Sequence, residues 1–163
     1  MSRSTTVSWQ DPRILSDAAR TMEGFDFLRA ICDGRLPQPP MAELLGFRLA
    51  QVDKGQVVFE CEPGERHYNP IGVVHGGLAM TMLDSCMACA VQTMVPAGAA
   101  YTTLEVKVNL VRAITSGVGK LRAVGRTIHV GSRVGTSEGR LEDASGKLYA
   151  HGTTTCIVLR NDK

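Results

Sequence analysis

The stretch from His75 to Met94 restricts the possible folds of this chain more than any other feature. It is apolar nearly all round at helical spacing, and a proline and a glycine follow it closely. A helix without a polar face has to be buried on most sides. Because the stretch also contains Asp84 and several uncharged polar residues, it is a poor candidate for crossing a membrane. We therefore expect one long helix that the rest of the domain encloses.

Strand-like runs stand on both sides of this helix in the sequence. The first run after the helix alternates apolar and polar residues from Thr103 to Leu110. Short connections join the last runs, among them a hairpin turn at 143–146, and this favours an antiparallel sheet. The predicted strands span 44–52, 56–62, 101–111, 118–130, 133–142 and 147–159. One curved antiparallel sheet wrapped around one central helix, an α+β fold, satisfies this order.

Residues 1–40 predict a helical extension in front of a domain that spans residues 41–163. Asp11 and Pro12 are typical of a helix start, and apolar residues then recur at helical spacing as far as Ile31. Gly24 divides this segment into two candidate helices. Three prolines within residues 37–40 mark its end.

Composition limits the partners that this chain can have. Its 18 Lys and Arg nearly balance 16 Asp and Glu, so no basic block favours nucleic acid. The five cysteines are odd in number and irregular in spacing, which predicts reduced thiols. The N-terminus has no apolar run of the signal-peptide kind. We expect a cytoplasmic protein that binds neither nucleic acid nor a membrane.

Asp84 is the anomaly of the long helix. Between His67 and Leu104 no other side chain carries a formal charge. An ionised carboxylate among apolar side chains costs several kcal/mol unless it is paired or hydrogen-bonded, and no cation stands three or four residues away. Backbone amides or hydroxyl groups could satisfy it, but the pattern favours a reactive base.

The start of the same helix reads His75-Gly76-Gly77. The first amides of a helix have no internal partner, and the helix dipole favours negative charge beside them. Glycine lets a ligand approach the backbone closely. The tripeptide therefore predicts a site for a carbonyl oxygen that becomes an oxyanion, although a capped helix start without function fits it as well.

Three segments together resemble the hotdog-fold acyl-CoA thioesterases of the phenylacetate-degradation (PaaI-like) type. They are 69–77 with Asp84 after it, 103–109 and 146–156, and the resemblance covers about residues 44–159. It implies a hotdog fold and hydrolysis of acyl- or aroyl-CoA, with phenylacetyl- and hydroxyaryl-CoA as candidate substrates. It implies no cofactor, since coenzyme A is part of the substrate.

The resemblance also implies how the site works. The Gly76 N–H would donate to the thioester carbonyl, and Asp84 would act as general base on water or as nucleophile through a mixed anhydride. Other residues would orient these two groups: His75 and Asn69 beside the amide, and a hydroxyl group beside the carboxylate. That hydroxyl is assigned to Thr103, with Thr102 as the alternative, and Gly77 is placed among the substrate contacts.

A second cluster lies at the turn between two predicted strands. Arginine and exposed amides suit the phosphates of coenzyme A, although a solvated hairpin end has the same composition. The resemblance favours a nucleotide-binding surface here, made of Arg126, His129, Gly131, Ser132 and Arg133.

Spacing along the helix predicts that two chains share the site. Eight residues separate Gly76 from Asp84, which is roughly 12 Å of helix. An oxyanion donor and a base must both reach a single carbonyl group. One helix cannot supply both, so we expect a homodimer, and the resemblance implies a dimer of dimers, which is a homotetramer.

Two other motifs and two other functions compete with this interpretation. Residues 135–139 fit G-x-S-x-G, but no helix follows, and Cys86-x-x-Cys89 lies in mid-helix without a second pair. We interpret both as packing and expect no metal site. The alternatives to a thioesterase are a hotdog hydratase or dehydratase and a non-catalytic acyl-CoA-binding module.

Overall fold

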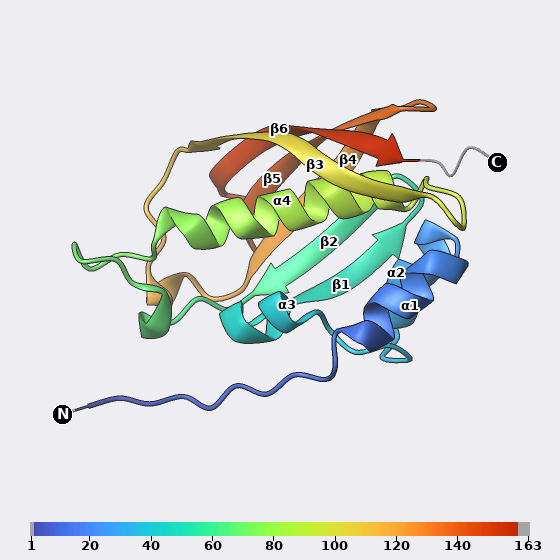
Figure 1. Cartoon of the computed structure of the whole chain (residues 1–163). Helices are drawn as coiled ribbons and strands as arrows, with labels where there is room; N and C mark the ends of the chain where they lie inside the picture. The colour runs from blue at the N-terminus through green and yellow to red at the C-terminus, as the bar shows by residue number, and fades with distance from the viewer. Residues whose placement is uncertain (1, 160–163) are drawn as a thin grey trace.

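The computed structural model describes residues 2–159, which form one antiparallel sheet and a long helix that lies across it (Figure 1). The strand order is β1-β2-β4-β5-β6-β3. The strands are β1 (Phe47–Asp53), β2 (Gln56–Cys61), β3 (Ala100–Leu110), β4 (Leu121–Val130), β5 (Val134–Asp143) and β6 (Leu148–Leu159). The helices are α1 (Arg13–Thr21), α2 (Gly24–Cys32), α3 (Pro40–Leu45) and α4 (Gly76–Gln92), with short 3-10 turns η1 (Glu65–His67) and η2 (Ser116–Val118). In this part of the chain no helix is long and apolar enough to cross a membrane.

The sheet curves around α4, as the sequence predicts. The helix packs against every strand from β2 to β6. In the view of Figure 1, β1 and β2 pass below α4, and β3 and β6 pass above it. Alternate residues of β4, β5 and β6 are buried, which is the pattern of strands with one face on a core. The predicted order of one helix and six strands is therefore confirmed.

Glycines on the sheet let α4 approach the strands closely. A Cβ atom on Gly125 would run into the backbone of Cys86 and Met87. One on Gly135 would meet Val91, and one on Gly139 would meet Met87 at 2.7 Å. The buried hydroxyl of Ser137 donates to the carbonyl oxygen of Met87 at 2.8 Å. The G-x-S-x-G sequence is thus a helix-packing motif, as its strand context predicts.

The beginning of the domain differs from the sequence prediction. The strand expected at 44–52 starts only at Phe47, because α3 occupies Pro40–Leu45. Proline at the first helical position favours this short helix, and Gly46 ends it with a left-handed φ of 68°. The helix α3 therefore spans the boundary predicted at residue 40. The two helices expected before it are present and separate at Gly24.

Hydrogen bonds hold α3 at both ends. Before the helix, the Gln38 side-chain oxygen accepts the N–H of Leu49 at 3.1 Å. After it, the buried ring of His67 lies 2.9 Å from the Leu45 carbonyl oxygen and accepts the Gly64 N–H at 3.0 Å on Nδ1. Burial lowers the pKa of His67, so the ring stays neutral and Nε2 is the donor to Leu45. The short helix is a fixed wall of the domain.

We expect Gly125→Ala to lower the free energy of unfolding by at least about 2 kcal/mol, because the added methyl group collides with helix backbone that cannot move aside. Urea denaturation measures the change. Gly117→Ala is the matched control, since the nearest atom to its Cβ is 4.0 Å away, and it should change stability by less than about 0.5 kcal/mol. Equal losses in the two variants would contradict the close helix–sheet packing.

Candidate active site

The loop before α4 is organised by Asn69. Its side-chain oxygen accepts the backbone N–H groups of Ile71 at 3.1 Å and Val73 at 3.2 Å. Gly72 turns the chain with a φ of 82°, a conformation that favours glycine. The N–H of His75 then donates to the carbonyl oxygen of His67 at 2.7 Å. The predicted orienting role of Asn69 thus has a structural basis in the loop that positions His75.

His75 caps the helix and leaves one amide free. Its Nδ1 accepts the N–H of Gly77 at 2.9 Å, and its carbonyl oxygen accepts the N–H of Leu78 at 3.0 Å. The N–H of Gly76 makes no hydrogen bond within residues 2–159. The amide of Gly77, expected among the substrate contacts, is instead used for capping. Gly76 is therefore the available donor at this helix end.

Each of the two glycines has a side chain close to its Cα. A Cβ atom on Gly77 would lie 2.9 Å from Nδ1 of His75, and one on Gly76 would run into the side chain of Leu110. The exposed His75 ring and the end of β3 therefore surround the free amide. This arrangement fits a polarised carbonyl group at the N-terminus of a helix.

Asp84 lies halfway along α4 and faces β3. The hydroxyl of Thr103 donates to its Oδ1 at 3.1 Å, and Oδ2 accepts no hydrogen bond from the described part of the chain. The sequence indicated a carboxylate stranded among apolar side chains. The structure shows a half-buried group with a neutral partner and no cation. Of the two candidate threonines, Thr103 makes the contact, while Thr102 is exposed on β3 and lines the pocket beside Asp84 without a hydrogen bond to it in the described part of the chain.

Asp84 stands between two hollows on the surface of the single chain. The first, which we call the α3 pocket, has a volume of about 350 Å³ and extends from Asp84 under α3. The second, the β3 pocket, has a volume of about 590 Å³ and lies beside Met80, Thr81 and residues 105–108. A water molecule or a substrate can reach the carboxylate from either side.

Thiols near Asp84 are not nucleophiles. Burial raises the pKa of Cys89 to about 12, and burial also raises the pKa of Cys156, whose sulfur lies 4.0 Å from the Thr103 hydroxyl. A thiol must lose its proton before it attacks a carbonyl group. All five cysteines are free thiols, so the interpretation of Cys86-x-x-Cys89 as packing holds. Within residues 2–159 no three His, Cys, Asp or Glu side chains gather as metal ligands.

The residues expected to bind the nucleotide share one hairpin. The Gly131 N–H donates to the Val134 carbonyl oxygen at 2.8 Å and closes the β4–β5 turn, while His129, Ser132 and Arg133 are exposed around it. Arg126 lies further down β4, and its Nε donates to the Gln56 side chain at 2.7 Å. The structure therefore gathers four of the five residues and places Arg126 apart from them.

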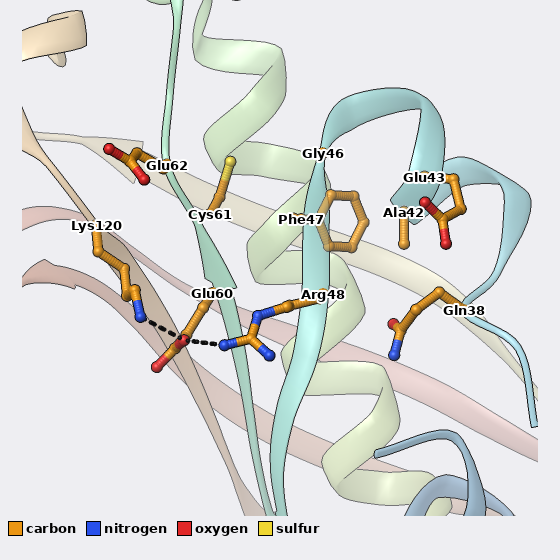
Figure 2. A pocket seen from close by; sticks show the side chains of 10 residues that line it. All are labelled: Gln38, Ala42, Glu43, Gly46, Phe47, Arg48, Glu60, Cys61, Glu62 and Lys120. Atoms are coloured by element: carbon orange, nitrogen blue, oxygen red, sulfur yellow. Dashed lines mark hydrogen bonds and ion pairs between the residues drawn. The ribbon is translucent and has the colours of Figure 1, made fainter. Parts of the chain in front are cut away.

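A polar hollow of about 400 Å³ at the edge of the sheet is not part of this site (Figure 2). Of its three carboxylates, Glu60 is paired with Arg48 and Lys120 at 3.2 Å each. No candidate catalytic residue lines it.

Sequence reasoning missed residues that do line the α3 pocket, among them Met41 and Tyr101. No pattern marked them, since α3 was expected to be a loop and a strand.

Comparisons with known proteins agree on one family. The sequence model of the "Thioesterase superfamily" matches residues 71–150. A Pseudomonas aeruginosa protein is 30% identical over 120 residues, which cover 73% of this chain and 81% of that protein. Its solved structure, titled a thioesterase, superposes with a TM-score of 0.69 at 26% identity and covers 83% of this chain and 93% of that one.

Two further proteins extend the comparison. A phenylacetic acid degradation-related protein from Ralstonia eutropha superposes with a TM-score of 0.71 at 30% identity, covering 80% of this chain and 98% of that one. A 1,4-dihydroxy-2-naphthoyl-CoA hydrolase from Listeria monocytogenes is 23% identical over 76% of this chain and 98% of that protein. The chain therefore belongs to the hotdog-fold thioesterase superfamily and is a thioester hydrolase.

Proposed function

We propose that this protein hydrolyses acyl-CoA thioesters at a site shared by two chains, with Asp84 from one chain and the Gly76 N–H from the other. The observation that carries the proposal is the free Gly76 amide at the capped start of α4, on the same helix as a carboxylate with one unoccupied oxygen. The two groups are roughly 12 Å apart along one helix, so a second chain has to complete each site.

The free edge of β3 supports this dimer. The strand has eleven residues, pairs only with β6, and exposes Leu104 and Leu110. Long unpaired edges of this kind are templates for pairing with another chain. In one chain, Gly76 packs beside Leu110 and Asp84 contacts Thr103. Antiparallel pairing that sets Leu110 of one chain near Thr103 of the other brings Gly76 and Asp84 together. A dimer of dimers is the larger assembly that we propose from the family resemblance.

The chemistry follows from the two groups. The thioester carbonyl oxygen accepts the Gly76 N–H, so the negative charge that develops on it is stabilised by an amide at a helix start. Thr103 occupies Oδ1 of Asp84, and Oδ2 takes a proton from the attacking water. The C–S bond then breaks, and the proton passes to the sulfur of coenzyme A. In the alternative path Oδ2 attacks the carbonyl carbon, the C–S bond breaks and coenzyme A leaves as the thiolate. Water then hydrolyses the mixed anhydride to the free acid and the Asp84 carboxylate, and a proton from that water goes to the thiolate.

The substrate we propose is an acyl- or aroyl-CoA with an aromatic acyl group, such as phenylacetyl-CoA or a hydroxylated aroyl-CoA. The exposed Arg133 and Ser132 at the β4–β5 turn suit the phosphates of coenzyme A. The names of the Listeria and Ralstonia relatives refer to naphthoyl-CoA and to phenylacetic acid, which are both aromatic. The reaction as written needs no cofactor, and we propose that it takes place in the cytoplasm.

We expect Asp84→Asn to lower kcat for phenylacetyl-CoA by at least about 10²-fold, because the amide keeps the size of the side chain but cannot accept the proton. Release of free coenzyme A thiol measures the rate. It also separates hydrolysis from hydration, which releases no thiol. Asp53→Asn, a change at an exposed aspartate on β1, is the control and should leave the rate unchanged. Near-normal turnover in Asp84→Asn would show that another group is the base.

Gly76→Pro removes the proposed oxyanion donor with little change to the helix. Proline is favoured at the first helical position, and His75 already has the extended conformation, with φ −61° and ψ 132°, that a residue before proline prefers. We expect kcat to fall by about 10²- to 10³-fold. Gly76→Ala is the matched control, because it adds a Cβ beside Leu110 but keeps the N–H. If the alanine variant loses as much activity as the proline variant, then the amide is not the donor.

A mixture of Asp84→Asn and Gly76→Pro chains should regain activity that neither variant has alone. Each mixed dimer contains one intact site of two, so the isolated mixed dimer should reach roughly half of the wild-type rate. The chains are unfolded together, refolded, and assayed after the mixed dimer is isolated with two different affinity tags. A verified mixed dimer without activity would contradict the shared site.

A further inference from the structure

The α3 pocket beside Asp84 is lined mainly by apolar side chains, together with the hydroxyl groups of Ser85, Thr102 and Thr103. Apart from Asp84 itself, no charged side chain contributes to it. Its walls come from α3, from Phe47 and Phe59 in edge-to-face contact at 5.5 Å, and from the face of α4 that carries Ala88 and Cys89. An apolar hollow of this kind accepts a neutral hydrocarbon or aromatic group. It offers no cation to a second carboxylate on an acyl chain.

Tyr101 closes the far end of this pocket. The same residue also lines a groove of about 530 Å³ that runs between α1 and the end of α4, which we call the α1 groove. Its hydroxyl donates to the Gln92 side-chain oxygen at 3.1 Å, and Gln92 lines the α1 groove. The hydroxyl also neighbours the Cys89 side chain, which lines the α3 pocket. The tyrosine therefore stands between the two hollows.

The hydrogen bond to Gln92 holds Tyr101 in this position. Burial raises the pKa of Cys89 to about 12, so the neighbouring thiol keeps its proton and is a neutral contact of the tyrosine. Burial likewise raises the pKa of Tyr101 well above its usual value, so the hydroxyl keeps its proton. The side chains of Tyr101 and Gln92 therefore lie between the α3 pocket and the α1 groove.

The α1 groove is suited to an apolar chain. Small apolar surfaces in this groove come from Ala19 on α1 and from Ala99 and Ala100 around the start of β3. Arg20 also lines the groove, and its exposed side chain is paired with Asp17. Removing the tyrosine ring would join this groove to the α3 pocket. The joined space could hold an acyl chain much longer than the α3 pocket alone can hold.

We propose that Tyr101 is the residue that limits acyl length, and that the protein therefore selects short neutral or aromatic acyl groups over long fatty acyl chains. This inference rests on the proposed function, because it takes the α3 pocket beside Asp84 as the acyl site. The wall opposite the helix is anchored by hydrogen bonds of Gln38, just before α3, and of Leu45, its last residue. Length selection is therefore assigned to the tyrosine.

Two thioether analogues that cannot be hydrolysed, S-butyl-CoA and S-dodecyl-CoA, test the pocket separately from catalysis. Calorimetric titration should show that Tyr101→Ala tightens binding of S-dodecyl-CoA relative to S-butyl-CoA by at least about tenfold, because eight further methylene groups gain a place to be buried. Tyr101→Phe is the matched control, since it keeps the ring and loses only the hydrogen bond to Gln92, and it should retain the wild-type preference. Tyr101→Leu is a second shortened variant that keeps an apolar side chain for packing.

Hydrolysis of butyryl-, phenylacetyl- and lauroyl-CoA is then measured with the same variants. The proposal predicts that the lauroyl to butyryl ratio of kcat/KM rises in parallel with the binding ratio in Tyr101→Ala and Tyr101→Leu. It also predicts poor turnover of succinyl-CoA compared with butyryl-CoA in the wild-type protein. An unchanged binding ratio in both folded variants would overturn the role of Tyr101. A shifted binding ratio without any thiol release would support the length limit and contradict the thioesterase reaction.

Discussion

The fold depends on the contact between the backbone of α4 and the concave face of the sheet. Residues without side chains at Gly125 and Gly139 let the helix lie against β4 and β5, and Ser137 donates to a helix carbonyl group. A helix with apolar residues nearly all round is stable in water only inside such a wrapping. The contact also fixes how the helix is rotated, and this decides which side chains face the open edge at β3. Asp84 is one of them.

The two ends of the helix have different tasks because of how they are held. At the start, Asn69 and His67 shape the loop, and His75 takes the Gly77 amide, so that one donor remains for a ligand. Toward the end, Gln92 holds Tyr101 between two hollows. In our proposal, the chemistry lies on α4 and the selection on the β3 residue that α4 holds, so both depend on one helix and not on the surface loops.

The sequence predicts the core of this arrangement because its signals are strong and local. The alternation of apolar and polar residues marked β3, and a proline and a glycine marked the end of the long helix. The single charge of Asp84 stood out within an apolar run. The same reasoning failed at α3, where apolar residues at 44–45 suggested a strand although Pro40 and Gly46 define a helix of six residues. It also placed Gly77 with the substrate, since the use of its amide by the His75 ring depends on a side-chain conformation that spacing does not reveal. The role proposed for Tyr101 depends on the two hollows that it lines, which α1 and α3 help to form far from it in the sequence. No local sequence pattern predicts that these segments meet at Tyr101.

The exposed edge of β3 has a consequence for the life of the protein in the cell. If the proposed dimer forms, a chain that has folded but not yet met its partner displays both the β3 edge and half of each site. The same encounter that hides the strand from other polypeptides would also create the first competent centre. Solubility and activity would then be acquired in one event. Selection against aggregation and selection for turnover would both act on the backbone N–H and C=O groups at the edge of β3.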